Sequence, residues 1–216
     1  MTIVTQLHEK YRPNRWDDIV GQDKILKRIE ALRKRSLAGR AYWITGPSGS
    51  GKTTTARLLA GEVADPAMIE ELDATDLTPA ALRQIEDLLA MYGWGKGGRA
   101  VIVNEAHGLR RDTIRQLLVM LERLPGHAMI VFTTTWAGEE LLFEGSEDAS
   151  PLLSRCIELR LTNQGLAQPF AERCKAIAEA EGLDGRPVEQ YVKLARECKS
   201  NMRAMLQKIE AGEMVA

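Results

Sequence analysis

The sequence has few cysteines, few aromatic residues and no long apolar run. Its three cysteines form no CxxC or CxxH pair, which argues against a zinc site and suits a reducing cytosol. Aromatic residues make up only 5% of the 216 residues, so the core must consist mainly of Leu, Ile, Val, Ala and Met. The opening MTIVTQLHEKYRPNRW has no signal-peptide core, and no stretch approaches a membrane span. We therefore expect a cytoplasmic protein without membrane contact.

An excess of charge is also missing. The chain carries 29 basic and 30 acidic side chains, for a formal net charge of −1. This balance excludes a protein that attracts nucleic acid through its overall charge. Any nucleic-acid contact must come from a local basic patch.

Strands and helices alternate along the first three quarters of the chain. The pattern predicts a fold of the α/β class, a parallel sheet with helices on both faces. Apolar runs predict strands at 41–45, 68–74, 99–106 and 127–135. Amphipathic periodicity predicts helices at 23–39, 52–64, 78–93 and 110–125.

The pattern changes near residue 163. Residues 164–216 contain three helical stretches and no convincing strand. We therefore expect a first domain over 1–162 and a small helical domain over 163–216. Residues 1–20 should be irregular, and the acidic stretch 138–150 should be a surface loop or short helix.

The segment GPSGSGKT, residues 46–53, matches the phosphate-loop pattern G-x-x-x-x-G-K-[ST]. It follows an expected strand and opens an expected helix, the context that phosphate binding requires. Backbone N–H groups would face the phosphates, Lys52 would reach the β- and γ-phosphates, and Thr53 would place a hydroxyl on Mg²⁺. The nucleotide-contacting residues expected here are Gly46, Pro47, Ser48, Gly49, Ser50, Gly51, Lys52, Thr53 and Thr54.

A second acidic site is expected at the end of the buried strand AVIVNE. Glu105 is placed to polarise the attacking water as a general base. Asn104 stands where such a protein normally has an aspartate that holds Mg²⁺. Its amide oxygen can still accept a hydrogen bond from a metal-bound water, but without a full negative charge metal affinity should fall. The alternative is that Glu105 merely ends a strand.

The chain resembles the AAA+ subunits of clamp loaders, that is, the small subunits of replication factor C and their bacterial gamma/tau relatives. HEKYRPNRWDDIVGQDKILKRIEAL, the phosphate loop, VIVNEAH, IVFTTT and SPLLSRCIELRL occur in that family's order. The triplet Ser154–Arg155–Cys156 is the most specific mark. The resemblance implies an ATP-binding P-loop module followed by a helical lid, with ATP and Mg²⁺ as cofactors.

The resemblance also implies roles for single positions. Thr135, or Thr134 if the alignment slips by one, would orient the water and the γ-phosphate. Arg155 would project into a neighbouring subunit's ATP site, and Arg203 would reach the γ-phosphate from the lid. The adenine pocket would be lined by Tyr11, Arg12, Pro13, Val20 and Gly21. Each could instead have an ordinary packing or surface role.

DNA contact is implied less directly. The stretch GLRRDTIRQ begins a helix with Arg110, Arg111 and Arg115 in a region that faces duplex DNA in clamp loaders. Arginines at a helix N-terminus suit phosphate contacts. The alternative is a solvated face paired with Asp112 and Glu122.

Three features depart from the family. They are Asn104, the long acidic stretch between Thr135 and Ser154, and the end of the sequence after the lid, without the collar that joins clamp-loader subunits. The expected function is an ATPase that assembles on duplex or primed DNA, as a homo- or hetero-oligomer and with a sliding clamp as a possible partner. The alternative is an ATP-dependent switch or adaptor with little hydrolysis.

Overall fold

The computed structural model describes residues 6–145 and 149–215. The chain divides into two compact units. One consists of Lys24–Gly46 and Lys52–Arg160, and the other of Met1–Asp23, Pro47–Gly51 and Leu161–Ala216. The domain boundary at residue 163 stays a prediction, since the helical unit also takes up the N-terminal segment and part of the phosphate loop.

The first unit contains a five-stranded parallel sheet within the described residues, in the order β2-β3-β4-β1-β5. Its strands are β1 Arg40–Thr45, β2 Ile69–Asp73, β3 Arg99–Asn104, β4 Ala128–Thr134 and β5 Cys156–Arg160. The three central strands are continuous apolar runs, as expected for strands covered on both faces. This confirms the α/β fold and the parallel sheet.

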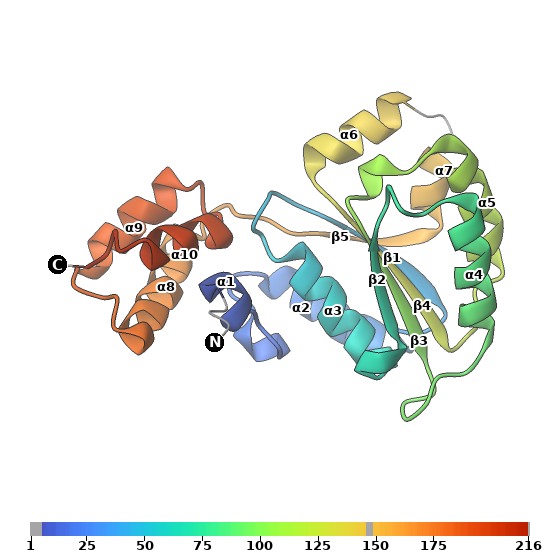
Figure 1. Ribbon diagram of the computed structural model, residues 1–216, viewed down its shortest axis with the longest axis horizontal. Coiled ribbons are helices and arrows are strands. Elements are labelled where there is room, and N and C mark those ends of the chain that lie inside the picture. The colour runs from blue at the N-terminus through green and yellow to red at the C-terminus, as the bar shows by residue number, and fades with distance from the viewer. Residues whose placement is uncertain (1–5, 146–148, 216) are drawn as a thin grey trace, which may run out of the picture. The chain divides into compact units, whose positions relative to one another are not determined.

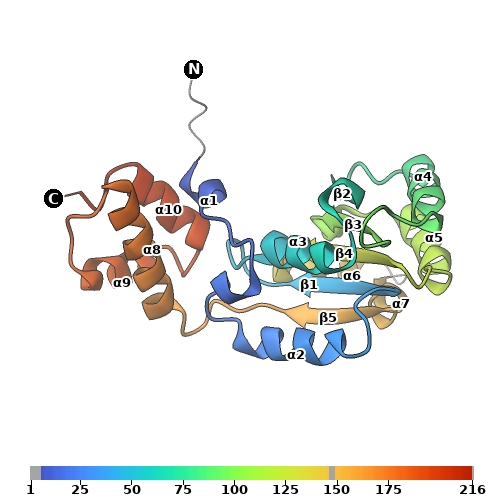
Figure 2. The same ribbon diagram turned by 90° about the horizontal axis from the view of Figure 1, so that it is seen from below.

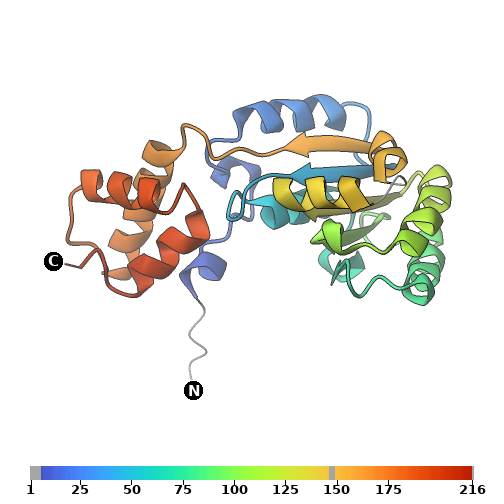
Figure 3. The ribbon, with the colours of Figure 1, turned by 90° about the horizontal axis from the view of Figure 1, so that it is seen from above.

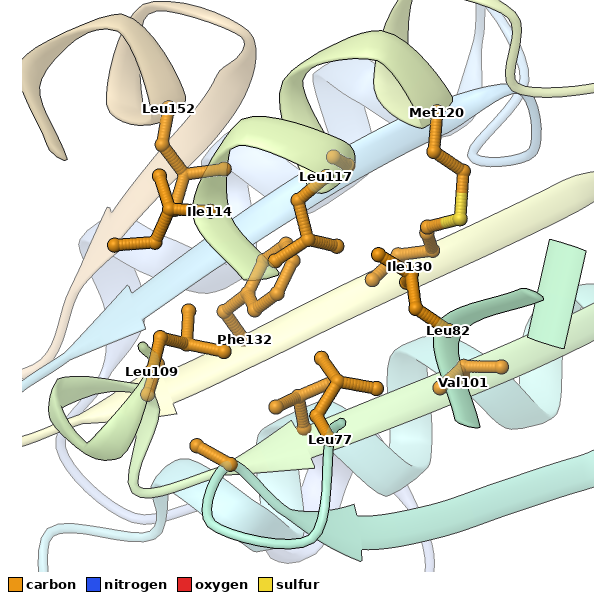
Figure 4. Packing of buried hydrophobic residues seen from close by; sticks show 14 of the residues in the cluster. Leu77, Leu82, Val101, Leu109, Ile114, Leu117, Met120, Ile130, Phe132 and Leu152 are labelled. Atoms are coloured by element: carbon orange, nitrogen blue, oxygen red, sulfur yellow. The ribbon is translucent and has the colours of Figure 1, made fainter. Parts of the chain in front are cut away.

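Helices cover both faces of this sheet. Helix α3 packs on β1, β3 and β4, whereas α4 and α5 lie on the opposite face (Figure 1). The helices of this unit are α2 Asp23–Arg33, α3 Lys52–Val63, α4 Pro79–Ala90, α5 Arg111–Glu122, α6 Trp136–Gly145 and α7 Ala149–Ser154. Figure 4 shows Leu117 and Met120 of α5 packed against Phe132 and Ile130 of β4. Such close packing makes the sheet a rigid base for the loops at its edge.

The carboxyl ends of all five strands lie along one edge because the strands are parallel. Figure 2 shows β1 and β5 running side by side in the same direction. Three of the segments that leave this edge begin at Gly46 after β1, at Glu105 after β3 and at Thr135 after β4. Residues far apart in the sequence are thereby brought together, in the place where ligands bind to open α/β sheets.

The second unit is helical. Its helices are α1 Leu7–Lys10, α8 Ala167–Glu181, α9 Val188–Glu197 and α10 Met202–Glu210. Helix α8 packs on α9 and α10, and the short blue helix α1 lies beside the red helix α10 in Figure 3. Leu7 of α1 shares a core with Phe170, Tyr191 and Leu206. The N-terminal segment is thus part of this unit.

Several sequence-based expectations need correction. Residues 1–20 are not wholly irregular, because α1 and a 3₁₀ turn at Trp16–Asp18 form there, although residues 1–5 lie outside the described part. Helix α2 ends at Arg33 rather than Gly39, since the backbone turns away at Ser36, which has φ of 73°. The acidic stretch is helical in α6 and α7, one of its two expected forms, but Glu139 is buried rather than at the surface, and residues 146–148 are outside the described residues. The mixed sequence of β5, CIELR, does not by itself predict the strand that forms there.

No helix in the described ranges has the length and apolar character needed to cross a membrane.

Candidate nucleotide-binding site

The phosphate loop connects β1 to α3. Gly49 and Gly51 have φ of 70° and 94°, values that glycine adopts without strain. A Cβ atom on Gly49 would lie 1.9 Å from Oδ1 of Asn201, so this position also lacks room for a side chain. Helix α3 begins at Lys52, as predicted, and its first N–H groups point back toward the loop. The local backbone therefore has the form that phosphate binding requires.

Polar groups of this loop are oriented inward. Lys52 is 9% exposed, and its Nζ donates to the carbonyl oxygen of Gly46 at 3.1 Å. The hydroxyl of Ser50 is buried and has no hydrogen-bond partner among the residues that the structure describes. A buried hydroxyl without a partner is costly, by about 1–3 kcal/mol, and a phosphate oxygen would satisfy it. The loop thus fits an anionic ligand.

Thr53 and Asn104, the two predicted metal-binding residues, lie side by side. The Thr53 hydroxyl donates to Oδ1 of Asn104 at 3.3 Å, and the Thr133 hydroxyl donates to the same oxygen at 2.9 Å. Hydroxyl and amide oxygens are suitable ligands for Mg²⁺ or for its bound waters. No group of three or more His, Cys, Asp or Glu side chains suited to a metal occurs within residues 6–145 and 149–215. A metal here would depend on nucleotide phosphates for most of its charge neutralisation.

The nitrogen of the Asn104 amide has a different partner. Its Nδ2 donates to Oε1 of Glu71, on the neighbouring strand β2, at 2.8 Å. Glu71 in turn receives two hydrogen bonds from Arg57 of α3. Sequence reasoning missed Glu71, Arg57 and Thr133, because no motif marks them and only the pairing of strands brings them to Asn104.

Glu105 follows β3 in the left-handed region, with φ of 50° and ψ of 48°. Its side chain is 57% exposed, and one carboxylate oxygen lies 3.5 Å from Nδ1 of His107. The same nitrogen of His107 lies 3.1 Å from the hydroxyl of Thr134. A non-glycine residue in this conformation carries some strain and is found more often at functional sites. Glu105 thus lies at the carboxyl edge of the sheet with its carboxylate open to solvent, and its role as a general base stays a prediction.

The three consecutive threonines at the end of β4, Thr133 to Thr135, have different partners. Thr133 contacts Asn104 and Thr134 contacts His107, whereas the hydroxyl of Thr135 accepts a hydrogen bond from the backbone N–H of Gly138 at 3.1 Å. Thr135 thus serves as a cap for the first turn of α6. The role predicted for Thr135, with Thr134 as its alternative, stays a prediction.

Residues 42–142 match the family model described as the ATPase family associated with various cellular activities, AAA. The match runs from β1 into α6 and covers slightly less than half of the chain.

The chain is similar to two groups of named proteins. It is 26% identical to the DNA polymerase III subunit tau of Bacillus subtilis over 203 residues, which cover 82% of this chain and 34% of that protein. It is 28% identical to the replication factor C small subunit of Natronomonas pharaonis over 184 residues, 82% of this chain and 53% of that protein. The chain therefore spans about a third to a half of these relatives.

A solved structure shares the fold. The Holliday junction branch migration motor RuvB of Thermotoga maritima superposes with a TM-score of 0.72 at 21% identity, over 93% of this chain and 64% of that one. Together with the family match, this confirms the AAA+ fold class. The resemblance to clamp-loader ATPases is also confirmed by the names of the relatives.

Of the remaining predicted residues in the sheet-containing unit, Arg155 lies away from the phosphate loop. Arg155 precedes β5 and therefore lies at the amino end of that strand, the end opposite to the loop. Its guanidinium contacts Glu122 of α5 and donates to the carbonyl oxygen of Pro151 at 3.0 Å. Arg110 is the N-cap residue of α5, and Arg111 and Arg115 are exposed on its first two turns.

The residues predicted to line the adenine pocket lie in the helical unit. Tyr11 and Val20 pack against the core of that unit, and the Tyr11 hydroxyl donates to Glu181. Arg12 pairs with Glu9, and Pro13 follows it. Gly21, with φ of 74°, lies so close to Leu166 that a Cβ atom would be 2.3 Å from its Cδ2. Their role toward adenine stays a prediction.

Arg203 lies near the loop within the helical unit. It is exposed in the first turn of α10, two residues after the N-cap Asn201. Because Asn201 lies against Gly49, the first turn of α10 is next to the phosphate-loop segment Pro47–Gly51. A γ-phosphate contact by Arg203 stays a prediction.

Proposed function

We propose that the protein is an ATPase of the clamp-loader type that works on DNA as part of an oligomer in the cytoplasm. The observation that carries this proposal is the cluster at the carboxyl edge of the sheet. There the Thr53 hydroxyl and the Asn104 amide lie 3.3 Å apart, and Glu105 follows directly. The names of the relatives, which are replication proteins, support the DNA-associated part.

The phosphate loop binds the triphosphate in this proposal. Lys52 exchanges its bond to the Gly46 carbonyl for the β- and γ-phosphates, and Ser50 donates its buried hydroxyl. Thr53 and Asn104 hold Mg²⁺, directly or through bound water. When bound, Mg²⁺ supplies positive charge that offsets the charge on the phosphate oxygens as the γ-phosphoryl group leaves.

Glu105 accepts the proton of the attacking water. Its exposed carboxylate, next to His107, gives it access to solvent at the sheet edge. General-base catalysis of this kind contributes about 10²–10⁴-fold to a rate. Arg155 lies at the other end of the sheet from the phosphate loop of its own subunit. The charge that develops in the transition state is therefore stabilised by Arg155 of a neighbouring subunit.

A second candidate function rests on Asn104. A neutral amide in place of a carboxylate weakens the attraction for Mg²⁺, so ATP could bind without efficient turnover. The protein would then be an ATP-dependent adaptor, in which bound ATP stabilises one conformation and recruits a partner.

Steady-state phosphate release with Mg·ATP, measured with and without primed DNA and a sliding clamp, separates the two functions. We expect turnover by the parent protein and a loss of at least about 100-fold in Glu105→Gln, with ATP affinity retained. Tight ATP binding by the parent without turnover under any of these conditions would favour the adaptor. Failure to bind ATP at all would contradict both functions.

A further inference from the structure

The side-chain amide of Asn104 is held in one orientation. Its two ends have different hydrogen-bonding capacity, because Oδ1 only accepts and Nδ2 only donates. The carboxylate of Glu71 can only accept, so it must face Nδ2, at 2.8 Å. Oδ1 is thereby turned toward Thr53 and Thr133, whose hydroxyls both donate to it. The Glu71 contact decides the orientation, and the two threonine hydroxyls, which could either donate or accept, are compatible with it.

Glu71 is itself held in place. Arg57 of α3 donates from Nε to Oε2 at 2.7 Å and from Nη2 to Oε1 at 3.1 Å. This two-bond contact between a guanidinium and a carboxylate is geometrically specific. Residues Glu71 and Ile102 are partners in the pairing of β2 with β3, which puts Glu71 two residues from the end of the strand that carries Asn104.

We propose that Glu71 is a positioning residue for the metal site, an inference that rests on the proposed binding of Mg·ATP. Glu71 keeps Oδ1 of Asn104 directed at Thr53, so that a neutral asparagine presents an acceptor to Mg²⁺ or its waters. Without Glu71 the amide could rotate and present its N–H₂ group, which repels a cation. The network of Arg57, Glu71 and Asn104 thus takes the place of a single aspartate.

The same geometry changes what is expected of Asn104→Asp. This substitution would place two carboxylates at hydrogen-bonding distance, where like charges repel. Arg57 balances only one of them. A bound cation relieves that repulsion, and an aspartate presents an acceptor oxygen in either orientation, so metal binding by the Asn104→Asp variant should depend little on Glu71.

A four-protein cycle tests this proposal, using the parent, Glu71→Gln, Asn104→Asp and the double variant. Calorimetric titration with a non-hydrolysable ATP analogue gives its dissociation constants in Mg²⁺ and in EDTA. Their ratio is the factor by which Mg²⁺ tightens binding. We expect Glu71→Gln to reduce this factor about threefold to tenfold when Asn104 is present, the range of one hydrogen bond. When Glu71→Gln is added to the Asn104→Asp variant, the factor should change much less, because an aspartate needs no orienting partner. Equal effects of Glu71→Gln in the two proteins, or none, would overturn the proposal.

Glu70→Gln is the matched control, because it removes the same charge from the neighbouring position of β2 and should leave the factor unchanged. A nucleotide-free readout accompanies the titration. In ¹H–¹⁵N spectra the side-chain amide of Asn104 should shift and lose protection from exchange in Glu71→Gln but not in Glu70→Gln. If no nucleotide binds but this shift is seen, the proposed function fails while the orientation by Glu71 stands. An unchanged amide signal contradicts that orientation.

Discussion

At the scale of one residue, Glu139 is a buried acidic side chain that takes no part in the proposed nucleotide binding. It lies in α6, is 7% exposed and accepts a hydrogen bond from the indole of Trp43 at 3.1 Å. Its pKa is raised above the usual value, chiefly because burial disfavours the charged form. The folded state therefore holds this proton more tightly than the unfolded chain, and stability falls as the pH rises through the raised pKa.

Glu139→Gln should stabilise the protein at pH 7.5. The glutamine oxygen can still accept from Trp43, and the buried charge is gone, which we expect to add about 1 kcal/mol to the free energy of unfolding. Thermal unfolding should move up by about 2–4 °C, and the difference should shrink as the pH approaches 4.5. Glu140→Gln, at an exposed neighbour, is the control. A loss of stability in Glu139→Gln, or a gain independent of pH, would contradict this assignment.

At the scale of elements, α5 carries a cluster of arginines at its N-terminal end, where the helix dipole is also positive. Arg110, Arg111 and Arg115 lie on its exposed N-terminal turns, while Ile114 and Leu117 are buried in the core. Cations at a helix N-terminus are unfavourable by about 0.3–1 kcal/mol each. An anion bound there would relieve this repulsion, which supports a contact with DNA phosphates.

Replacing these three arginines by alanine should weaken binding of primed DNA and reduce its dependence on salt. Each lost phosphate contact lowers the slope of log K against log salt by about 0.9, so the slope should fall by up to about 3. Lys24, Lys27 and Arg28, exposed on α2, provide a triple alanine variant with the same charge change. Fluorescence anisotropy at several salt concentrations makes the comparison. Equal effects of both triple variants would show that only overall charge matters.

The elements differ in how well the sequence predicts them. Helix α3 begins at Lys52 as expected because the glycine-rich loop marks its start, and four strands follow from their apolar runs. Strand β5 has the mixed sequence CIELR and was not assigned. Thr53, Asn104 and Glu105 could be selected by spacing alone. The contact of Asn104 with Glu71 could not, because it depends on how two strands pair rather than on a local motif.

At the scale of the whole molecule, Arg155 is the residue whose proposed role needs a second copy or a related subunit. It precedes β5, and the five residues of that strand span about 16 Å at 3.3 Å each before the carboxyl edge is reached. Arg155 is bound to Glu122 on the surface of its own unit, and its side chain is 32% exposed. The account therefore predicts an ATPase site completed by a neighbour.

Mixing two inactive variants tests this prediction most directly. Glu105→Gln lacks the base of its own site and Arg155→Ala lacks the arginine for its neighbour's, so each alone should release little phosphate from ATP. In a 1:1 mixture, about a quarter of randomly paired sites would combine an intact Glu105 with an intact Arg155, and activity should return to that level. Glu105→Gln mixed with Lys52→Ala restores no site and should stay inactive. A mixture of the first pair that stays inactive, or an Arg155→Ala variant as active as the parent, would contradict the account.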